Sequence, residues 1–306
     1  MDRQDFNELV ALAMAQPGRA AMRPVVEKEI LHYDIFHALD KAGLLKHLVF
    51  QGGTSLRLCR GSSRFSEDLD FAGGKDFSTS AMLPIKSCLE HHIGERYGFN
   101  VEVKEPREMS LLPELDGVKV DKWQISIETA PQQRDLPQQR IKIEIANIPA
   151  YTRELVPLRS NYDFLLGYNS VLVNTESLDE VMADKLIAFP ASTKVIRYRD
   201  VWDLAWLVQQ GAKLNPALVE LKIADYRIVD FPGLLAAAIA RVPGIVTGKP
   251  FKDQMLRFID SDTIAKTLEN PEFLEYLTMS VNGLLSKLAS VLADPHSEGE
   301  SSVFKM

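Results

Sequence analysis

The chain has 306 residues, of which 46% are hydrophobic and 25% are charged, as in an ordinary globular protein. Its 35 basic and 42 acidic residues give a net charge of −7, which argues against a protein that coats nucleic acid nonspecifically. A chain of 306 residues is expected to form one large domain or two smaller ones.

Cysteine content and hydropathy indicate a cytoplasmic protein. The two cysteines, Cys59 and Cys88, form neither a disulfide framework nor a zinc pattern, so we expect small core residues in a reducing compartment. The sequence shows no signal-peptide layout and no run of about 18 apolar residues, so neither export nor membrane insertion is expected.

The N-terminal part reads as helical. Residues 5–14 form one predicted helix, and residues 24–42 a longer one that starts at Pro24 and ends before Gly43. His32, His37 and His47 occur in this part, but no second ligand type accompanies them at metal spacing. We therefore expect structural or surface histidines.

A strand, a glycine turn and a helix follow in direct succession. Residues 48–51 are an apolar strand that runs into Gly52 and Gly53, where the backbone can turn tightly and approach a ligand. Thr54 or Ser55 is then expected to cap a helix whose first N–H groups face the ligand. This order predicts a phosphate site, although a Gly-Gly pair alone is more often a plain turn.

Two aspartates come shortly after this turn. Asp68 and Asp70 flank Leu69 on a predicted strand, so both carboxylates project from one face while Leu69 and Phe71 point to the core. An isolated Asp-x-Asp is usually a solvated edge, but paired carboxylates also suit Mg²⁺. A phosphate site beside a magnesium site predicts chemistry on a nucleoside triphosphate.

The wording Gly-Gly-Thr-Ser-Leu-Arg, followed by Arg-Phe-Ser-Glu-Asp-Leu-Asp-Phe, resembles the first motif of the nucleotidyltransferase superfamily. More narrowly, it resembles the AbiEii toxin family with its MenT relatives. The resemblance implies that Asp68 and Asp70 bind Mg²⁺ and are catalytic. It also implies a set of residues that contact the nucleotide: Gly52, Gly53, Thr54, Ser55, Arg57 and Ser66.

The chain then alternates between strands and one helix. A helix is predicted over residues 78–97, and strands are predicted over 99–103, 122–128 and 140–145. Residues 106–117 are loop-like, and residues 131–139 are a predicted connection between the last two strands, which we expect to be antiparallel.

In the strand over residues 140–145, isoleucines alternate with Lys142 and Glu144. The Lys-Ile-Glu-Ile wording resembles the family's second motif, which implies that Glu144 is a third metal-binding and catalytic carboxylate. The alternative is a solvent-exposed face on which Lys142 and Glu144 have no catalytic role.

A domain boundary is predicted near residue 175, where the sequence turns helical. Ser177 and Glu180 have the spacing of a capping box at the start of a helix that Pro190 ends. Further helices are predicted over residues 194–207, 214–226, 233–241, 251–259 and 271–292, followed by a frayed polar end, 294–306.

Two segments of this region resemble the family's third and fourth motifs. They are Ala-Asp-Lys-Leu at 183–186 and Arg-Asp-Val-Trp-Asp-Leu at 199–204. The resemblance implies that Lys185 contacts the triphosphate and that Asp200 or Asp203 is required for activity. The alternatives are a surface lysine, and ion pairs of the two aspartates with Arg197 or Arg199.

The sequence therefore predicts an α/β (α+β) protein: a mixed sheet of nucleotidyltransferase type flanked by helices in residues 1–175, and a helical C-terminal domain in residues 176–306. The active cleft is expected between the two domains. The resemblance implies a magnesium-dependent nucleotidyltransferase, the toxin of a toxin–antitoxin system used in phage defence. Its partners would be an NTP, a tRNA modified at the 3′ acceptor end so that translation stops, and a separately encoded antitoxin, often a DNA-binding repressor.

Two other classes of function remain open. One is a transferase with the same core that moves a nucleotidyl or phosphoryl group to a protein or to a small molecule such as an antibiotic. The other is an inactive nucleotide-binding or scaffolding module, against which the intact pair of Asp68 and Asp70 argues.

Overall fold

The computed structural model describes residues 5–106, 118–130 and 138–294. The chain divides into two compact units, one of residues 1–177 with 256–265, the other of residues 178–255 with 266–306. A seven-stranded mixed sheet lies in the first unit, which confirms the predicted α/β class. The predicted loop over 106–117, the connection over 131–139 and the polar end fall almost wholly outside the described residues.

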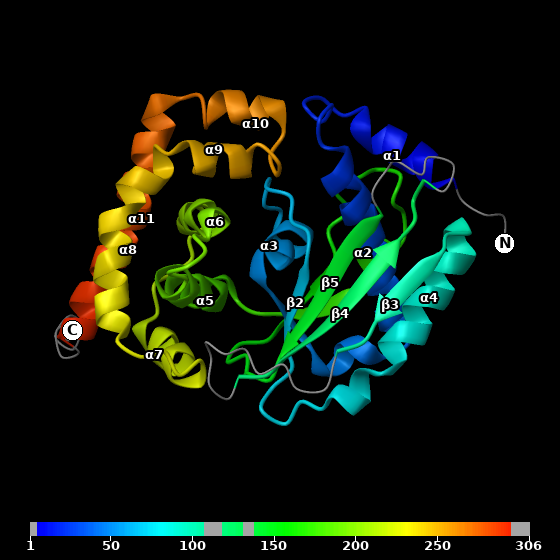
Figure 1. The fold of residues 1–306 in the computed structure, drawn as a ribbon, viewed down its shortest axis with the longest axis horizontal. Helices are drawn as coiled ribbons and strands as arrows, with labels where there is room; N and C mark the ends of the chain where they lie inside the picture. The colour runs from blue at the N-terminus through cyan, green and yellow to red at the C-terminus, as the bar shows by residue number, and fades with distance from the viewer. Residues whose placement is uncertain (1–4, 107–117, 131–137, 295–306) are drawn as a thin grey trace, which may run out of the picture. The chain divides into compact units, whose positions relative to one another are not determined.

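The sheet of the first unit has the strand order β3-β4-β5-β2-β1-β7-β6. Figure 1 labels the four strands from β3 to β2. Its strands are β1 Val49–Gln51, β2 Leu69–Ala72, β3 Val101–Lys104, β4 Val120–Ile127, β5 Gln139–Ala146, β6 Glu154–Pro157 and β7 Leu172–Thr175. The pairs β1–β7 and β2–β5 are parallel, and the other neighbours are antiparallel. The expected antiparallel pairing of β4 with β5 is confirmed.

Four helices accompany the sheet: α1 Phe6–Met14, α2 Arg23–Lys41, α3 Gly52–Arg60 and α4 Pro84–Tyr97. Short 3₁₀ turns occupy Leu44–His47, Thr79–Met82 and Tyr168–Ser170. The Asp5 side chain caps α1 by accepting from the Asn7 amide at 2.8 Å, so the helix begins one residue after the predicted start. The helix predicted over residues 78–97 is thus a 3₁₀ turn followed by α4.

Aromatic side chains join α2 to the centre of the sheet. The ring of Phe36 lies 4.8 Å from that of Phe50 on β1, and Phe50 lies 5.1 Å from Phe71 on β2. All three are fully buried, and Leu69 and Phe71 face the core as their alternation predicts. This packing fixes the strand that carries Asp70 against α2.

The first unit is completed by residues 256–265, far along the chain. The Phe65 amide donates to the Phe258 carbonyl at 2.7 Å, and the Ser261 amide donates to the Gly18 carbonyl at 3.0 Å. The helix predicted over residues 251–259 is therefore wrong in its second half. It ends at Met255, and a short helix that was not predicted, α10 Ser261–Lys266, follows.

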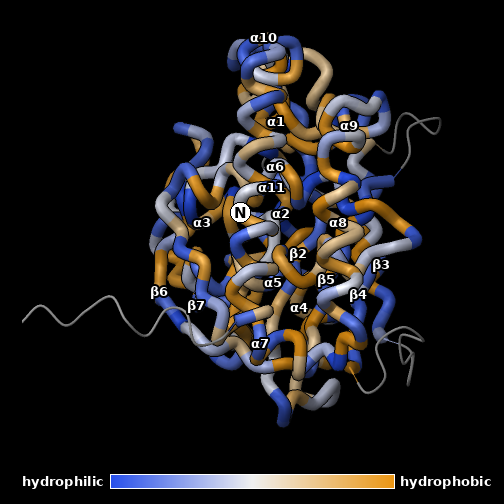
Figure 2. The backbone as a smooth tube through the Cα atoms, turned by 90° about the vertical axis from the view of Figure 1, so that its left-hand side faces the viewer, coloured by the Kyte–Doolittle hydropathy of each residue, from blue (hydrophilic) through white to orange (hydrophobic). Residues whose placement is uncertain are grey.

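The second unit is helical, as predicted. Its helices are α5 Leu178–Ala191, α6 Tyr198–Gln209, α7 Pro216–Asp225, α8 Phe231–Val246, α9 Lys249–Met255 and α11 Pro271–Ala293. Pro190 lies inside the last turn of α5 instead of ending the helix before it. Figure 2 colours most of α8 as hydrophobic. Within the described ranges no single helix is long and apolar enough to cross a membrane, and α8 with α9 passes only as a pair bent by 75°.

Candidate active site

The predicted carboxylates meet in the middle of the sheet. In the strand register, Asp70 of β2 lies opposite Gln51 of β1 on one side and Glu144 of β5 on the other. Glu144 in turn lies opposite Lys122 of β4, whose Nζ is 3.1 Å from Glu144 Oε1. Residues opposite one another share a face of the sheet, so these four side chains form one polar row.

Asp68 lies beside this row, just before β2 begins. Its Oδ1 accepts from the Lys142 amide at 3.3 Å, and its Oδ2 is 3.8 Å from Lys142 Nζ. Asp68 and Glu144 are partly open to solvent, with 33% and 25% of their side chains exposed. Each carboxylate is therefore paired with a lysine, and a bound ligand can displace that lysine because exposed ion pairs are weak.

The turn before α3 closes tightly on these carboxylates. Gly52 has a φ of +76°, and a Cβ added there would lie 2.7 Å from Asp70 Oδ2. At Gly53 an added Cβ would lie 2.3 Å from Arg64 Nη2 and 3.3 Å from Ser66 Oγ. Both glycines thus let the start of α3 approach the residues that follow it in the motif.

The expectation that Thr54 or Ser55 caps this helix is wrong, because α3 already begins at Gly52. Both residues lie in its first turn. The Thr54 hydroxyl donates to the Asp68 carbonyl, and the Ser55 hydroxyl donates to the Gly52 carbonyl at 2.8 Å. Thr54 therefore ties the helix to the residue that carries the first carboxylate.

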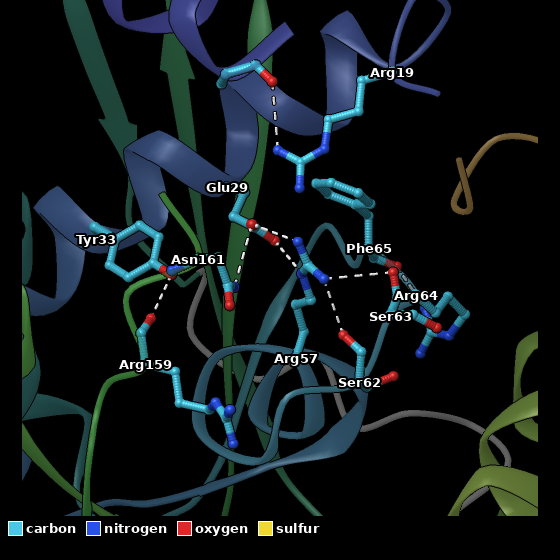
Figure 3. A network of polar contacts seen from close by, with 11 residues as sticks. Arg19, Glu29, Tyr33, Arg57, Ser62, Ser63, Arg64, Phe65, Arg159 and Asn161 are labelled. Carbon is cyan, nitrogen blue, oxygen red and sulfur yellow. Dashed lines mark hydrogen bonds and ion pairs between the residues drawn. The ribbon is translucent and has the colours of Figure 1, made fainter. Parts of the chain in front are cut away.

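Arg57, expected at the nucleotide, lies in a buried ion pair. Its Nε and Nη2 donate to the two carboxylate oxygens of Glu29 at 2.7 and 2.9 Å (Figure 3). Burial would raise the pKa of Glu29, but Arg57 outweighs this effect and holds that pKa below its usual value. This placement favours a structural role for Arg57 over a contact with phosphate.

A second cluster of predicted residues lies within the helical unit. Lys185 on α5 places its Nζ 2.9 Å from Asp200 Oδ1 and 2.7 Å from Asp203 Oδ2, both on α6. All three residues are buried, so Lys185 is not the surface lysine that the sequence left open. Burial favours a higher pKa for Asp200, but Lys185 and Arg197 outweigh it and lower that pKa.

The ion-pair alternative for the aspartates holds in part. Arg197 Nε contacts Asp200 Oδ2, while Asp203 pairs with Lys185. The three expected residues thus form one charged group, in which Asp200 and Asp203 orient the lysine.

The chemistry of the polar row fits a hard divalent cation. Asp68, Asp70 and Glu144 offer carboxylate oxygens on one side of the sheet, the ligand type that Mg²⁺ prefers. Gln51 Oε1 is buried beside them and has no hydrogen-bond partner among the described residues. Across that same part of the chain, no three His, Cys, Asp or Glu side chains are grouped closely enough to hold an ion. The three carboxylates are thus of the right chemical type but are not gathered into an ion site, and Lys142 and Lys122 pair with Asp68 and Glu144.

A sequence model of the family described as "Nucleotidyl transferase AbiEii toxin, Type IV TA system" matches residues 34–279, well over half of the chain. The chain belongs to this AbiEii family. It is accordingly an enzyme, a nucleotidyltransferase toxin of a type IV toxin–antitoxin system, with an NTP as substrate and a separate antitoxin as partner.

Two solved structures share the fold of this AbiEii-family chain. MenT4, a nucleotidyltransferase toxin from Mycobacterium tuberculosis H37Rv, superposes with a TM-score of 0.57 at 18% identity, covering 94% of this chain and 93% of its own. JHP933 from Helicobacter pylori gives a TM-score of 0.51 at 18% identity, covering 88% and 95%. No curated protein matches the sequence.

The sequence interpretation did not single out Gln51 and Lys122, which lie beside the carboxylates, or Glu29, the partner of Arg57. The signal for Lys122 was present, because it lies on the polar face of an alternating strand like Glu144. Only the register between β4 and β5 places the two side by side. Glu29 gave no local signal, since its partner Arg57 is 28 residues away.

Proposed function

We propose that this AbiEii-family enzyme transfers a nucleotidyl group from an NTP to an RNA hydroxyl, at the 3′ acceptor end of tRNA, and so blocks translation. The observation that carries the proposal is the register of β2 with β5. It sets Asp70 directly beside Glu144, in front of the Gly52 turn. Paired carboxylates next to a helix N-terminus are suited to a metal-bound triphosphate.

In the proposed reaction the acceptor hydroxyl oxygen forms a bond to the α-phosphorus, and the bond from that phosphorus to the pyrophosphate oxygen breaks. Asp68, Asp70 and Glu144 hold Mg²⁺, which supplies charge neutralisation for the phosphoryl oxygens when bound. Glu144 completes this ligand set or accepts the proton of the attacking hydroxyl. Pyrophosphate leaves with the electron pair of the broken bond.

The nucleotide is bound by the turn and first helical residues at Gly52, Gly53, Thr54 and Ser55, with Ser66 beside them. The N–H groups at the start of α3 favour phosphate there, because a helix N-terminus offers amide donors and a partial positive charge, and the cap residue Gln51 makes no side-chain capping bond. Lys185 contacts the triphosphate, and Asp200 and Asp203 keep its ammonium group in position.

The proposed biological setting rests on membership of the AbiEii family. The enzyme acts in the cytoplasm, where NTPs and tRNA are found, and serves in phage defence. The antitoxin is a separately encoded protein, a DNA-binding repressor.

The proposal is tested by supplying the purified protein with Mg²⁺ and each NTP, labelled at the α-phosphate or, in a parallel reaction, at the γ-phosphate, in the presence of a tRNA pool, a protein lysate or a set of antibiotics. We expect label at the tRNA 3′ end with wild type and none with Asp70→Asn. Label in protein or in a small molecule would show that the acceptor is that molecule and not RNA. No Asp70-dependent label with any acceptor would overturn the assignment of the polar row.

A further inference from the structure

One segment connects the nucleotide turn to the carboxylates. Residues 62–68, here called the carboxylate loop, follow α3 and lead directly into β2. They include Asp68 and determine where Asp70 lies. The loop has no regular secondary structure of its own. Its position must therefore come from contacts with its surroundings.

Arg57 is the main contact. Its Nη1 donates to the carbonyl of Ser62 at 3.0 Å and to that of Ser63 at 3.4 Å, and its guanidinium lies 4.2 Å from the centre of the Phe65 ring (Figure 3). The Nε and Nη2 groups of the same guanidinium donate to Glu29, as described above. One buried side chain thus contacts three residues of the loop, Ser62, Ser63 and Phe65.

Helix α2 supports the loop at its other end. Lys28 Nζ is 2.7 Å from Glu67 Oε1, and His32 Nε2 donates to the Glu67 carbonyl at 3.0 Å. Glu29 lies between these two residues on the same helix, and Asn161 Nδ2 donates to it at 3.3 Å. The helix therefore contacts the loop directly through Lys28 and His32 and indirectly through Glu29 and Arg57.

A buried ion pair is an inefficient way to stabilise a fold, since apolar residues of the same volume often do as well or better. What apolar residues cannot do is present a planar fork of donors to two backbone carbonyls and a carboxylate at once. The geometry of Arg57 thus gives the pair a function that stability alone does not explain.

We propose that Glu29 and Arg57 are positioning residues, which fix the carboxylate loop so that Asp68 and Asp70 stand correctly for nucleotidyl transfer. Neither touches the reacting atoms; Glu29 orients the guanidinium, and the guanidinium orients the loop. This inference rests on the proposed roles of Asp68 and Asp70. It goes beyond them by explaining why two buried charges lie behind the site.

The first test compares Arg57→Lys, which keeps the charge and loses the fork, with Glu29→Gln. We expect the kcat of NTP transfer per folded molecule to fall by about 10–100-fold, with KM for the NTP within about threefold, because a displacement of about 1 Å has costs of this order. Amide hydrogen exchange of residues 62–68 should become faster in the same variants. Unchanged exchange in the loop would overturn the inference without reference to any substrate.

The matched control is Asp34→Asn, on the same helix as Glu29. Asp34 is fully buried and accepts from Tyr97 at 2.6 Å, with Arg96 3.2 Å away, and these partners lie outside the carboxylate loop. It should lower thermal stability while leaving both loop exchange and kcat per folded molecule as in wild type.

A second variant separates position from stability. Glu29→Leu combined with Arg57→Met removes both charges, so it should fold with a melting temperature near that of wild type. The kcat should nevertheless stay about 10–100-fold low, because the loop has lost its donors. Recovery of wild-type kcat in this double variant would overturn the inference. If wild type itself transfers no label to any acceptor, the proposed function fails, and loop exchange still decides the positioning role.

Discussion

At the scale of single residues, the candidate site brings several charged side chains close together. Asp70 and Glu144 are neighbours across two strands, and Glu144 is neutralised in part by Lys122. Like charges at this spacing repel each other and are retained when a ligand needs both. The charges of the polar row are thus better explained by binding than by stability.

Asp70→Asn tests that explanation. It should remove nucleotidyl transfer and, in a bacterium without the antitoxin, the growth arrest that wild type causes on induction. Stability should be equal or slightly higher, because one of two adjacent negative charges is gone. Label transfer and thermal unfolding measure the two effects. Asp76→Asn, at an exposed position of the same unit, is the control and should behave as wild type.

Lys185 is both buried and expected to be functional, so its effects on stability and on activity have to be separated. Lys185→Ala leaves Asp200 and Asp203 buried without their shared cation, and we expect a loss of about 3–5 kcal/mol in the free energy of unfolding. Lys185→Met with Asp203→Leu should recover most of this stability while Asp200 keeps Arg197.

Activity separates the two roles of Lys185. If the lysine contacts the triphosphate as pyrophosphate leaves, kcat should remain about 10²–10³-fold low even in the stable double variant, while a direct binding assay still detects NTP. Wild-type kcat and KM in that variant would show that Lys185 serves only the packing of α5 on α6.

At the scale of elements, the strand–turn–helix from β1 to α3 depends on glycine at one position. Gly52 and Gly74 both have positive φ, +76° and +87°, but only Gly52 has a neighbour, Asp70 Oδ2, that an added Cβ would meet. A comparison of the two therefore separates backbone strain from displacement of the carboxylate.

We expect Gly74→Ala to cost about 1–3 kcal/mol of stability and to keep its kcat, since strain is its only penalty. Gly52→Ala should carry the same strain and also push Asp70 away, so that kcat falls by about 10²-fold. Denaturant unfolding and label transfer on the two variants measure this difference. Equal activities would show that Asp70 tolerates the shift.

Elements with a local signal were predictable, and pairings between distant elements were not. Alternation predicted the strand with Glu144, and two glycines after an apolar run predicted the turn before α3. The adjacency of Asp70 to Glu144 depends on a strand register that no local pattern encodes. β6 was missed because its four residues, nearly all exposed, do not alternate. Arg57 was expected at the nucleotide for the same reason: its partner Glu29 is remote in sequence.

At the scale of the whole molecule, burial of one histidine couples folding to pH. His32 is fully buried, and its burial lowers its pKa from 6.5 to about 4, more than the Glu67 carbonyl that it contacts raises it. Between about pH 4 and 6.5 the unfolded chain therefore binds more protons than the folded one. The contribution of His32 to the free energy of unfolding is fully present above pH 6.5 and decreases as the pH falls toward 4.

The decrease amounts to at most about 3 kcal/mol, at 1.36 kcal/mol per pKa unit. His32→Gln, which keeps an N–H donor for the Glu67 carbonyl, should lose less stability between pH 7 and pH 5 than wild type does. Urea unfolding at the two pH values measures the difference. His47→Gln, at an exposed position, should retain the wild-type dependence.

The first unit is discontinuous along the chain, and this has a consequence for synthesis on the ribosome. The Phe65 amide finds its partner only at Phe258, roughly 190 residues later. At about 5–20 residues per second, the ribosome needs about 10–40 s after the loop before Asp68 to synthesise Phe258, which bonds to it. A nascent toxin therefore cannot complete the segment that leads to its carboxylates until most of the chain has been made. Over this interval an antitoxin that is already present can meet the nascent chain before the toxin becomes active.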